Sequence, residues 1–295
     1  MALVKKIDIH THLYEISQMP RPGSGDTYCN PGQLLSMYEK LGIERGVVLP
    51  EVNPECLLGV QSNEDILRIV AMYPDRFSWF CNIDPRAMAN SPDADLSYMI
   101  RYYKDRGAKG VGEICAHLYF DDPRVLNLFK HCEMNDMPVI FHMSLQNGGD
   151  YGLIDDLGLV RFEKCLQMFP NLKFLGHSQA FWAHMSADIT KESSRGYPTG
   201  KVTDGRIAQL MRKYPNLCGD MSAGSGYNAF ARDEEYACAF MEEFQDQLYF
   251  GTDICSPFND MKLSHWLDEL VIAGKISQTV YEKISRTNAE KLLGL

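Results

Sequence analysis

Two histidines separated by one residue end the first apolar run of the chain, in the segment Ile7–His12. Because side chains alternate along a β-strand, His10 and His12 would point the same way at the end of a strand. Two neighbouring imidazoles can bind one divalent metal ion. Asp8 is in phase with them, one step deeper in the strand. The pattern also fits two surface histidines beside a turn, so the spacing alone does not decide between the two.

Four later apolar runs also stop at or beside a residue that can bind a metal. Those residues are Glu113, His142, His177 and Asp253. Any one of them could be a structural residue of the core, but chance explains five such strand ends poorly. Histidines together with a carboxylate suit zinc, and also manganese, iron, cobalt or nickel. The sequence predicts a divalent metal, with zinc as first choice, bound by His10, His12, His142 and Asp253.

The open position of such a metal would hold water, whose pKa falls toward ~7, so that hydroxide is available at neutral pH. Asp253 would bind the metal and take the proton from the attacking water. His177 would be a further ligand or a group that polarises a substrate carbonyl. Glu113 could bridge two ions, or accept a hydrogen bond from a histidine ring beside one ion. Of these alternatives we slightly favour the single ion.

Substrate contacts are expected from residues that follow the strand ends. Arg195 and Arg232 could each hold a substrate carboxylate through two parallel hydrogen bonds, although most arginines lie on the surface. His117 and His184 could line the pocket or be polar loop residues.

Four other polar residues have less direct roles in this interpretation. Asp220 and Ser222, around the end of the seventh strand, could hydrogen-bond to metal-binding side chains. His131 and His265 lie in amphipathic segments, and we expect both on the surface.

Eight short apolar runs must position these residues. They are Val4–Ile9, Arg45–Leu49, Phe77–Ile83, Gly110–Ile114, Val139–His142, Lys173–Gly176, Leu217–Met221 and Leu248–Gly251. Continuous apolar runs suit parallel strands that are buried on both faces. Eight strand–helix units in a row close into a (β/α)8 TIM barrel, whose functional residues come from the carboxyl ends of the strands. The alternative is an open doubly wound sheet, but the GxGxxG motif is absent after the first strand.

Segments of helical period separate and follow the strands. They are Pro31–Leu41, Asn63–Met72, Leu96–Lys104, Arg124–Asn135, Val160–Met168, Ile207–Lys213 and Asp233–Phe244, with Met261–Ala273, Gln278–Ser285 and Asn288–Leu293 as extra C-terminal helices. Residues 13–32 and 185–205 are rich in Gly, Pro and Ser and would cover the mouth of the barrel. No strong boundary divides the chain, so we expect residues 1–295 to form a single domain.

Composition limits the partners. The net charge is −10, with 39 acidic and 29 basic residues, which argues against nucleic acid and anionic membranes. The nine cysteines show no CxxC pair, and we expect buried thiols in a reducing compartment. No signal-peptide region and no membrane-length apolar stretch is present, so we expect a cytoplasmic protein that acts on a small molecule. The choice between a monomer and a homodimer stays open.

These residues resemble the amidohydrolase superfamily, and within it the amidohydrolase-2 branch of aminocarboxymuconate-semialdehyde decarboxylase-like metal-dependent hydrolases. The resemblance runs from the segment Ile7–His12 to the closing segment Asn288–Leu295. It implies that His177 lies near the substrate and that a metal is bound by His10, His12, His142 and Asp253. Many relatives carry Lys in the fourth strand, whereas here Lys109 precedes that strand and Glu113 ends it. The Gly-Glu-Ile end is similar to a deoxyribonuclease-like branch with two metals, which leaves the metal count open.

The resemblance implies two reactions. The first is hydrolysis of an amide, ester or lactone by metal-bound hydroxide. The second is non-oxidative decarboxylation of a small carboxylated substrate. A phosphodiesterase would need a basic groove, which the acidic balance argues against. A purely structural metal would more often be bound by cysteines.

Overall fold

Eight parallel strands form a closed barrel in the computed structural model, which describes residues 2–16, 18–56 and 59–295. The strands, in their order around the barrel, are β1 (Lys6–Thr11), β2 (Ile43–Val48), β3 (Phe77–Trp79), β4 (Val111–Ile114), β5 (Val139–Ser144), β7 (Phe174–His177), β8 (Leu217–Asp220) and β9 (Leu248–Tyr249). Backbone hydrogen bonds between Cys81 and Gly110 connect β3 to β4, and bonds such as His12 N–H to Ile254 O close β9 onto β1. The predicted (β/α)8 barrel is confirmed.

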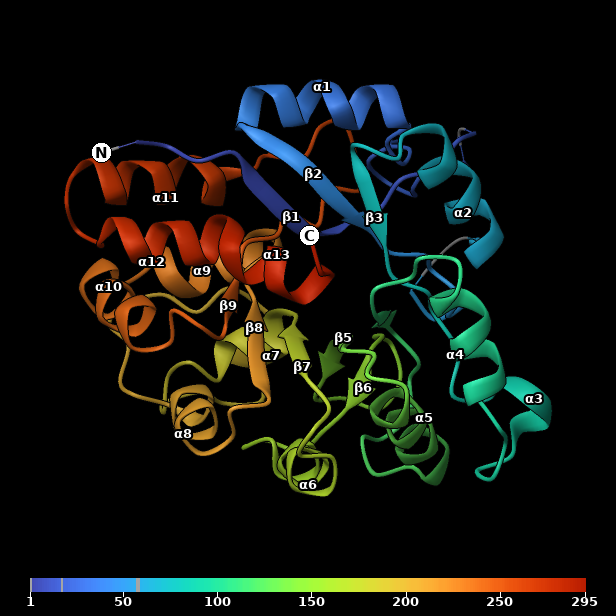
Figure 1. Cartoon of the computed structure of the whole chain (residues 1–295). Helices are drawn as coiled ribbons and strands as arrows, with labels where there is room; N and C mark the ends of the chain where they lie inside the picture. The colour runs from blue at the N-terminus through green and yellow to red at the C-terminus, as the bar shows by residue number, and fades with distance from the viewer. Residues whose placement is uncertain (1, 17, 57–58) are drawn as a thin grey trace.

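Helices surround the barrel on all sides (Figure 1). They are α1 (Pro31–Leu41), α2 (Asn63–Met72), α3 (Ala87–Asn90), α4 (Ser97–Lys104), α5 (Pro123–Met134), α6 (Val160–Met168), α7 (Gln179–Ala183), α8 (Arg206–Lys213), α9 (Ala223–Ala231), α10 (Glu234–Glu243), α11 (Lys262–Ile272), α12 (Gln278–Glu282) and α13 (Asn288–Leu293). The sequence did not predict α3, α7 and α9, nor β6 (Leu153–Ile154), which pairs with the end of β5. These elements are short or rich in glycine, so their periodicity is weak.

Local capping explains why several predicted helices have the expected bounds. The Asn30 side chain accepts a hydrogen bond from the Gln33 backbone N–H, the Gln33 side chain bonds back, and Pro31 opens the first turn of α1. Gly42 ends the helix at φ 70°, a conformation that glycine adopts without strain. Ser62 and Asp65 form the same reciprocal cap at the start of α2.

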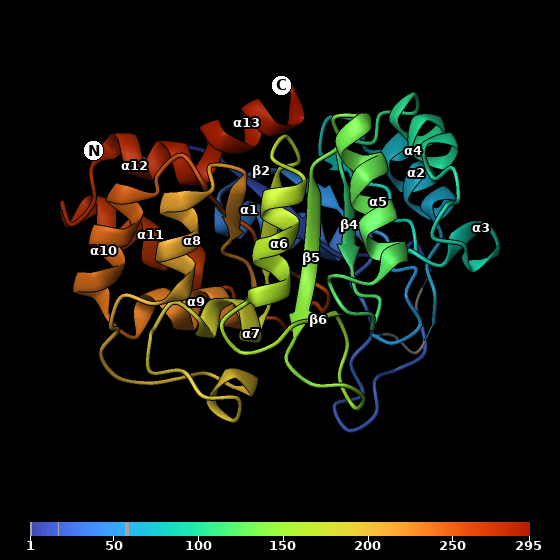
Figure 2. The same cartoon turned by 90° about the horizontal axis from the view of Figure 1, so that it is seen from below.

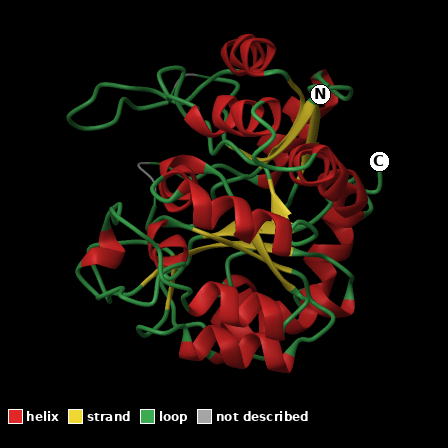
Figure 3. Ribbon diagram, turned by 90° about the vertical axis from the view of Figure 1, so that its left-hand side faces the viewer, coloured by secondary structure: helices red, strands yellow, loops and turns green. Residues whose placement is uncertain are grey.

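The carboxyl ends of the strands and the long loops share one end of the molecule. In Figure 2, the arrowhead of β5 points down, toward the side from which the loops between β1 and α1 and between α7 and α8 project. Figure 3 shows the strands inside a layer of helices, with long loops on the left and both termini on the right. The loops over residues 13–16, 18–30 and 185–205 therefore border the mouth of the barrel, where the sequence predicted segments 13–32 and 185–205.

Two irregularities in the sheet fall at residues expected to carry chemistry. Between β1 and β2 the register advances from Asp8↔Gly46 to Thr11↔Val48, so β1 contains one extra residue. Between β4 and β5 it advances from Val111↔Val139 to Ile114↔Phe141, so β4 also contains one extra residue. Such bulges redirect side chains. They turn His10 and Glu113 toward the mouth. As a result, Asp8 and His10 do not point the same way, although their spacing of two residues predicted that they would.

Apolar side chains fill the opposite half of the barrel. This cluster, named here the barrel floor, consists of Ile7, Ile9, Val47, Leu49, Phe80, Ile140, Leu175, Cys218, Tyr249, Ala289 and Leu293. The last two belong to α13, which covers that end of the barrel. The extra C-terminal helices therefore complete the core.

Three further expectations can be compared with the structure. All nine cysteines are free thiols, and six are buried. His265 is exposed as predicted, but the surface prediction for His131 is wrong. His131 is buried because α5 packs against α4, where the Ser97 hydroxyl hydrogen-bonds to His131 Nδ1 at 2.7 Å. Among the described residues, no helix has both the length and the apolar character needed to cross a membrane.

Candidate metal centre

His10 and His12 point their Nε2 atoms at each other across 2.9 Å. The Nδ1 atom of His10 lies 2.6 Å from Asp220 Oδ2, and that of His12 lies 3.0 Å from the Leu49 carbonyl oxygen. Because both Nδ1 atoms face acceptors, both carry the proton, and a neutral ring then has its lone pair on Nε2. Two lone pairs at this separation repel each other unless a proton or a metal cation lies between them. The pair therefore fits a metal ion.

Two carboxylates complete this first group. Glu113 Oε2 lies 3.5 Å from His10 Nε2 and 3.6 Å from His12 Nε2. Asp253 Oδ1 lies 3.5 and 3.4 Å from the same two atoms. Ligands about 2.1 Å from a tetrahedral zinc ion lie about 3.4 Å from one another. The distances from each carboxylate to the two Nε2 atoms thus match those between ligands of one metal ion.

A second group forms around the other oxygen of Glu113. His142 Nδ1 lies 3.0 Å from Glu113 Oε1, and His177 Nε2 lies 3.9 Å from the same oxygen. These three residues can share a metal, as can His10, His12 and Asp253. The structure thus assembles all six residues expected at the site, but it places His142 with Glu113 and His177 rather than with the His10–His12 pair. Glu113 lies between the two groups.

Before a metal binds, the negative carboxylates of the centre offset the positive charges of its histidine rings. Burial alone would lower the pKa of His10, but Asp220, Asp253 and Glu113 raise it to about 10. The pKa of His12 is also raised against the effect of burial, mainly by Glu51 and by Asp253. Protons therefore occupy the ring positions that a metal would take, and metal binding must release them.

Asp253 differs from the other ligand candidates in exposure and backbone. Its side chain is 26% exposed, whereas that of Glu113 is 8% exposed and that of His10 is fully buried. Burial would raise the pKa of Asp253, but the neighbouring His10, His12 and His177 lower it, so the carboxylate is ionised. Its φ of 57° is unusual for a residue with a side chain and is typical of functional positions.

Asp8 stabilises the turn that holds Asp253. The Asp8 carboxylate accepts hydrogen bonds from the Thr252 N–H and hydroxyl at 2.8 and 2.6 Å, and from the Tyr38 hydroxyl at 2.6 Å. It lies outside both groups because of the bulge in β1. Asp8 is therefore a structural residue that fixes the end of β9.

Asp220 and Ser222 lie behind the histidines, as the sequence suggested. Asp220 is fully buried, and its Oδ2 faces the Nδ1 atoms of His10 and His177 at 2.6 and 3.2 Å. The Ser222 hydroxyl donates to the same oxygen at 2.9 Å and lies 3.0 Å from His177 Nδ1. Together they orient two rings.

Glu51 was missed by the sequence interpretation. It is buried, accepts hydrogen bonds from the hydroxyls of Tyr28 and Tyr14 at 2.9 and 3.3 Å, and lies 3.9 Å from His12 Nδ1. Burial raises its pKa, although the charge of His12 opposes the shift. Glu51 follows the inward-facing Val47 of β2 and Leu49, just past the strand, at intervals of two residues, which is the signal that could have identified it.

Two cavities lie near the centre: the first reaches it only through Glu51, which Tyr14 and Tyr28 contact, and the second is lined by the candidate ligand His142. The first, of about 610 Å³, is lined by the rings of Tyr14 and Tyr28, by Arg21 and by Cys56. The second, of about 200 Å³, is lined by His142, Tyr151, Lys191 and Arg195. Neither Lys191 nor Arg195 has an acidic partner within 4 Å among residues 2–16, 18–56 and 59–295. The second cavity therefore offers two free positive charges beside His142.

The other three residues expected to bind substrate have different surroundings. His117 uses Nδ1 and Nε2 to hold Gly152 O and Gly148 N–H, and His184 uses both ring nitrogens on backbone groups of Ala180 and Gly158. Their rings have no nitrogen left for a ligand. Arg232 lines a separate cavity of about 490 Å³ together with residues 186–199, and none of the six candidate ligands lines it.

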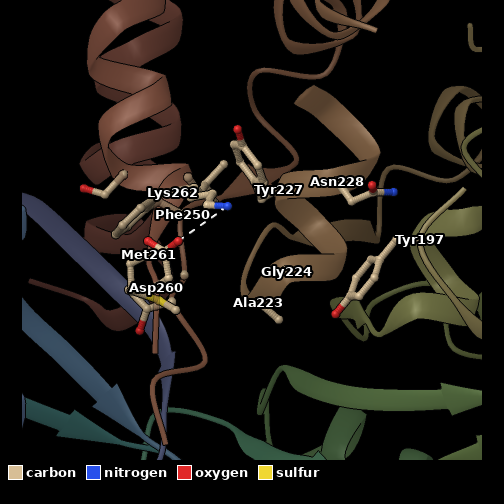
Figure 4. Close-up of a pocket in the computed structure, with 13 residues that line it drawn as sticks. Tyr197, Ala223, Gly224, Tyr227, Asn228, Phe250, Asp260, Met261 and Lys262 are labelled. Atoms are coloured by element: carbon tan, nitrogen blue, oxygen red, sulfur yellow. Dashed lines mark ion pairs between the residues drawn. The ribbon is translucent and has the colours of Figure 1, made fainter. Parts of the chain in front are cut away.

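A further cavity, of about 340 Å³, lies behind the end of β9 (Figure 4). It is lined by Gly251 and Thr252, by Tyr227 of α9, and by Tyr197, whose hydroxyl points toward Gly224 in the close-up. None of the six candidate ligands lines it.

The fold and the site define a (β/α)8 barrel with histidines and carboxylates gathered at the carboxyl ends of its strands. The sequence profile of the family described as amidohydrolase matches residues 7–295. The chain therefore belongs to the amidohydrolase family, as the resemblance predicted. A search of curated proteins finds no match.

Solved structures with the same fold include three that cover nearly the whole chain. An uncharacterised TIM-barrel protein from Bordetella bronchiseptica has 21% identity and a TM-score of 0.69 over 99% of each chain. A probable 2-pyrone-4,6-dicarboxylic acid hydrolase from Acinetobacter baumannii, with citric acid bound, has 13% identity and a TM-score of 0.63 over 99% of this chain and 100% of its own. A dihydroxybenzoic acid decarboxylase from Polaromonas, with manganese and 2-nitroresorcinol, has 15% identity and a TM-score of 0.63 over 99% of this chain and 98% of its own.

Proposed function

We propose that the protein is a metal-dependent hydrolase that cleaves an ester, lactone or amide bond in a small carboxylated substrate. The observation that carries the proposal is the position of Glu113, whose two oxygens face two separate groups of histidines. A carboxylate in that position suits a pair of divalent ions that share it, an arrangement common in metallohydrolases. We propose zinc as the natural metal, since one amidohydrolase with this fold carries it.

The proposed ligands are His10, His12 and Asp253 for one ion, His142 and His177 for the other, and Glu113 for both. Bound divalent ions would supply two effects: a lower pKa for water and polarisation of the scissile carbonyl. Asp253, ionised and partly exposed, is placed to accept the proton from the attacking water and to return it to the leaving group. The other carboxylates are too buried to exchange protons readily with solvent.

The substrate is proposed to carry a carboxylate because Lys191 and Arg195 line the cavity beside His142. A guanidinium can hold a carboxylate with two parallel hydrogen bonds. The fold relative from Acinetobacter is a probable hydrolase of a dicarboxylic acid and has citric acid bound, which supports this class of substrate. The cavity lined by Tyr14 and Tyr28 offers an apolar wall for the rest of the molecule.

Decarboxylation of an aromatic acid is the second candidate. The aromatic wall of the larger cavity favours it, and the fold relative from Polaromonas is a decarboxylase with manganese and a nitroresorcinol bound. A single metal ion would suffice for that reaction. The number of ions and the product therefore separate the two proposals.

The decisive experiment compares wild-type protein with the Glu113→Gln variant, both purified without chelator. For the hydrolase we expect two ions per wild-type chain, one or none in the variant, and acid release from carboxylated lactones and esters. A matched control is Glu269→Gln, a change in α11 outside the centre, which should keep both ions. One ion in both wild type and Glu113→Gln, with release of carbon dioxide from hydroxybenzoates, would overturn the hydrolase in favour of the decarboxylase.

A further inference from the structure

Asp220 connects the two groups of the centre through the protonated sides of two histidine rings. Its Oδ2 lies 2.6 Å from His10 Nδ1 and 3.2 Å from His177 Nδ1, and these rings belong to different groups. We infer that Asp220 is a shared positioning residue that sets the orientation of a ligand in each group and so couples the two metal positions. The inference rests on the two-metal arrangement proposed above.

The same atoms could be mistaken for a third metal site, because His10, His177 and Asp220 also gather donor atoms within 4.8 Å. The distances argue against that reading. Two ligand atoms of one zinc ion lie about 3.4 Å apart, whereas His10 Nδ1 and Asp220 Oδ2 are separated by only 2.6 Å. That separation is typical of a strong N–H to carboxylate hydrogen bond. A proton, rather than a metal, lies between these atoms.

Asp220 is held so firmly that it can impose this geometry. Its other oxygen, Oδ1, accepts the Ser222 backbone N–H at 3.0 Å, and its backbone carbonyl accepts the Trp182 indole N–H at 2.7 Å. A Cβ atom at Gly251 would come within 2.7 Å of Oδ1, so a side chain at position 251 would displace the carboxylate. Hydrogen bonds to both carboxylate oxygens and to the backbone carbonyl therefore hold Asp220 in this position.

The orientation has a direct consequence for the lone pairs. With Nδ1 bound to a carboxylate as a donor, each ring must present Nε2 to the centre. In His10 that atom faces His12 Nε2, and in His177 it faces Glu113 Oε1 and Asp253 Oδ2 at 3.9 and 3.7 Å. One carboxylate thus prepares one ligand for each ion. The Ser222 hydroxyl, 3.0 Å from His177 Nδ1, supports the second ring more than the first.

The test replaces Asp220 with Asn, which keeps the size but turns one acceptor oxygen into a donor amide. Because the Ser222 backbone N–H must keep its acceptor at the Oδ1 position, the amide NH₂ is expected at the Oδ2 position, where both rings lose their acceptor. Loss of such a partner weakens metal binding by roughly 10- to 100-fold. We expect this loss for both ions in Asp220→Asn, measured by competition with a chromogenic zinc chelator. Ser222→Ala should affect the second ion more than the first.

The matched control is Asp155→Asn, because Asp155 is equally buried and accepts three backbone N–H bonds but contacts no histidine. It should leave zinc affinity at the wild-type value. Unchanged zinc affinity in Asp220→Asn, or a loss confined to one ion, would overturn the shared role.

A second readout separates this inference from the proposed function. Nδ1 carries a hydrogen-bonded proton with or without metal, so nitrogen-15 NMR should show exchange-protected ring N–H signals for His10 and His177 in chelator-treated wild type. Both signals should be lost in Asp220→Asn and kept in Asp155→Asn. If wild type binds only one ion but shows both protected signals, the two-metal proposal and the coupling fail, while the orientation of both rings by Asp220 stands. If either protected signal is absent from wild type, the inference itself fails.

Discussion

The two halves of the barrel are built by the same strands and have opposite character. Ile140, Leu175 and Cys218 belong to the apolar barrel floor, and the residues two positions later are His142, His177 and Asp220 of the centre. Two residues along a strand correspond to about 6.6 Å. Within that distance the barrel interior changes from a packed hydrocarbon core to a cluster of charges and protonated rings.

The difference shows how stability and function are divided. The floor contains no titratable carboxylate or histidine and is covered by α13, so its side chains contribute through burial and close packing. The centre gathers carboxylates and histidines where desolvation opposes every charge, and only mutual pairing or a metal offsets that cost. Changes in the two halves should therefore have separable effects.

The largest effect is expected from His12→Ala in the centre. Loss of a ligand should release at least one ion, and loss of several kcal/mol of transition-state stabilisation corresponds to about a thousandfold lower kcat/KM. Metal analysis and steady-state kinetics measure both quantities. Loss of this buried imidazole also removes a partner of Glu113 and Asp253, so the chelator-treated variant should be less stable than wild type as well, as urea unfolding measures. An active variant with its full metal content would remove His12 from the centre.

The next effect is expected from Ile7→Ala in the barrel floor. Ile7 is 2% exposed, and shortening a buried isoleucine costs about 2–5 kcal/mol of stability. Urea unfolding of chelator-treated protein measures this loss. Metal content and kcat at 25 °C should remain those of wild type. A loss of metal content that accompanies the loss of unfolding free energy would show that the two halves do not act separately.

The pH dependence of metal affinity tests whether His10 is protonated in the metal-free centre. Since Asp220, Asp253 and Glu113 raise the pKa of His10 to about 10 against the effect of burial, the ring is protonated at neutral pH and must lose a proton to bind metal. Zinc affinity should therefore rise with pH and fall as pH is lowered, by about tenfold per pH unit for each proton released. Chelator competition between pH 6 and pH 9 measures the slope. A flat profile would contradict protonated rings in the metal-free centre.

The smallest effect is expected at the rim of the mouth. Arg195→Gln and Lys191→Gln should each raise KM for a carboxylated substrate about tenfold with little change in kcat, because a charge-assisted hydrogen bond contributes about 1.5–3 kcal/mol. Neutral esters of the same substrate serve as the control and should show no change. Arg232→Gln, in the separate cavity, should leave KM unchanged. A rise in KM only for Arg232→Gln would move the carboxylate site to that cavity.

Much of this architecture could be predicted from local sequence features. The apolar runs located all eight barrel strands, and capping residues such as Asn30 and Ser62 explain why α1 and α2 have the predicted bounds. The end of an apolar run at or beside a residue that can bind a metal identified His142 and His177. These features depend on neighbours in the chain, so they can be recognised without knowledge of the fold.

Contacts between distant strands decided the rest. An extra residue in β1 and another in β4 turn His10 and Glu113 inward, and a bulge is defined only relative to the partner strand. The grouping of His142 with Glu113, the burial of His131 against α4, and the placement of Arg232 outside the centre depend on which elements pack together. The sequence by itself thus determined which residue types end each strand. The closed barrel decided how they group around Glu113 and Asp220, because only closure brings His10 of β1 close to Glu113 of β4 and Asp220 of β8.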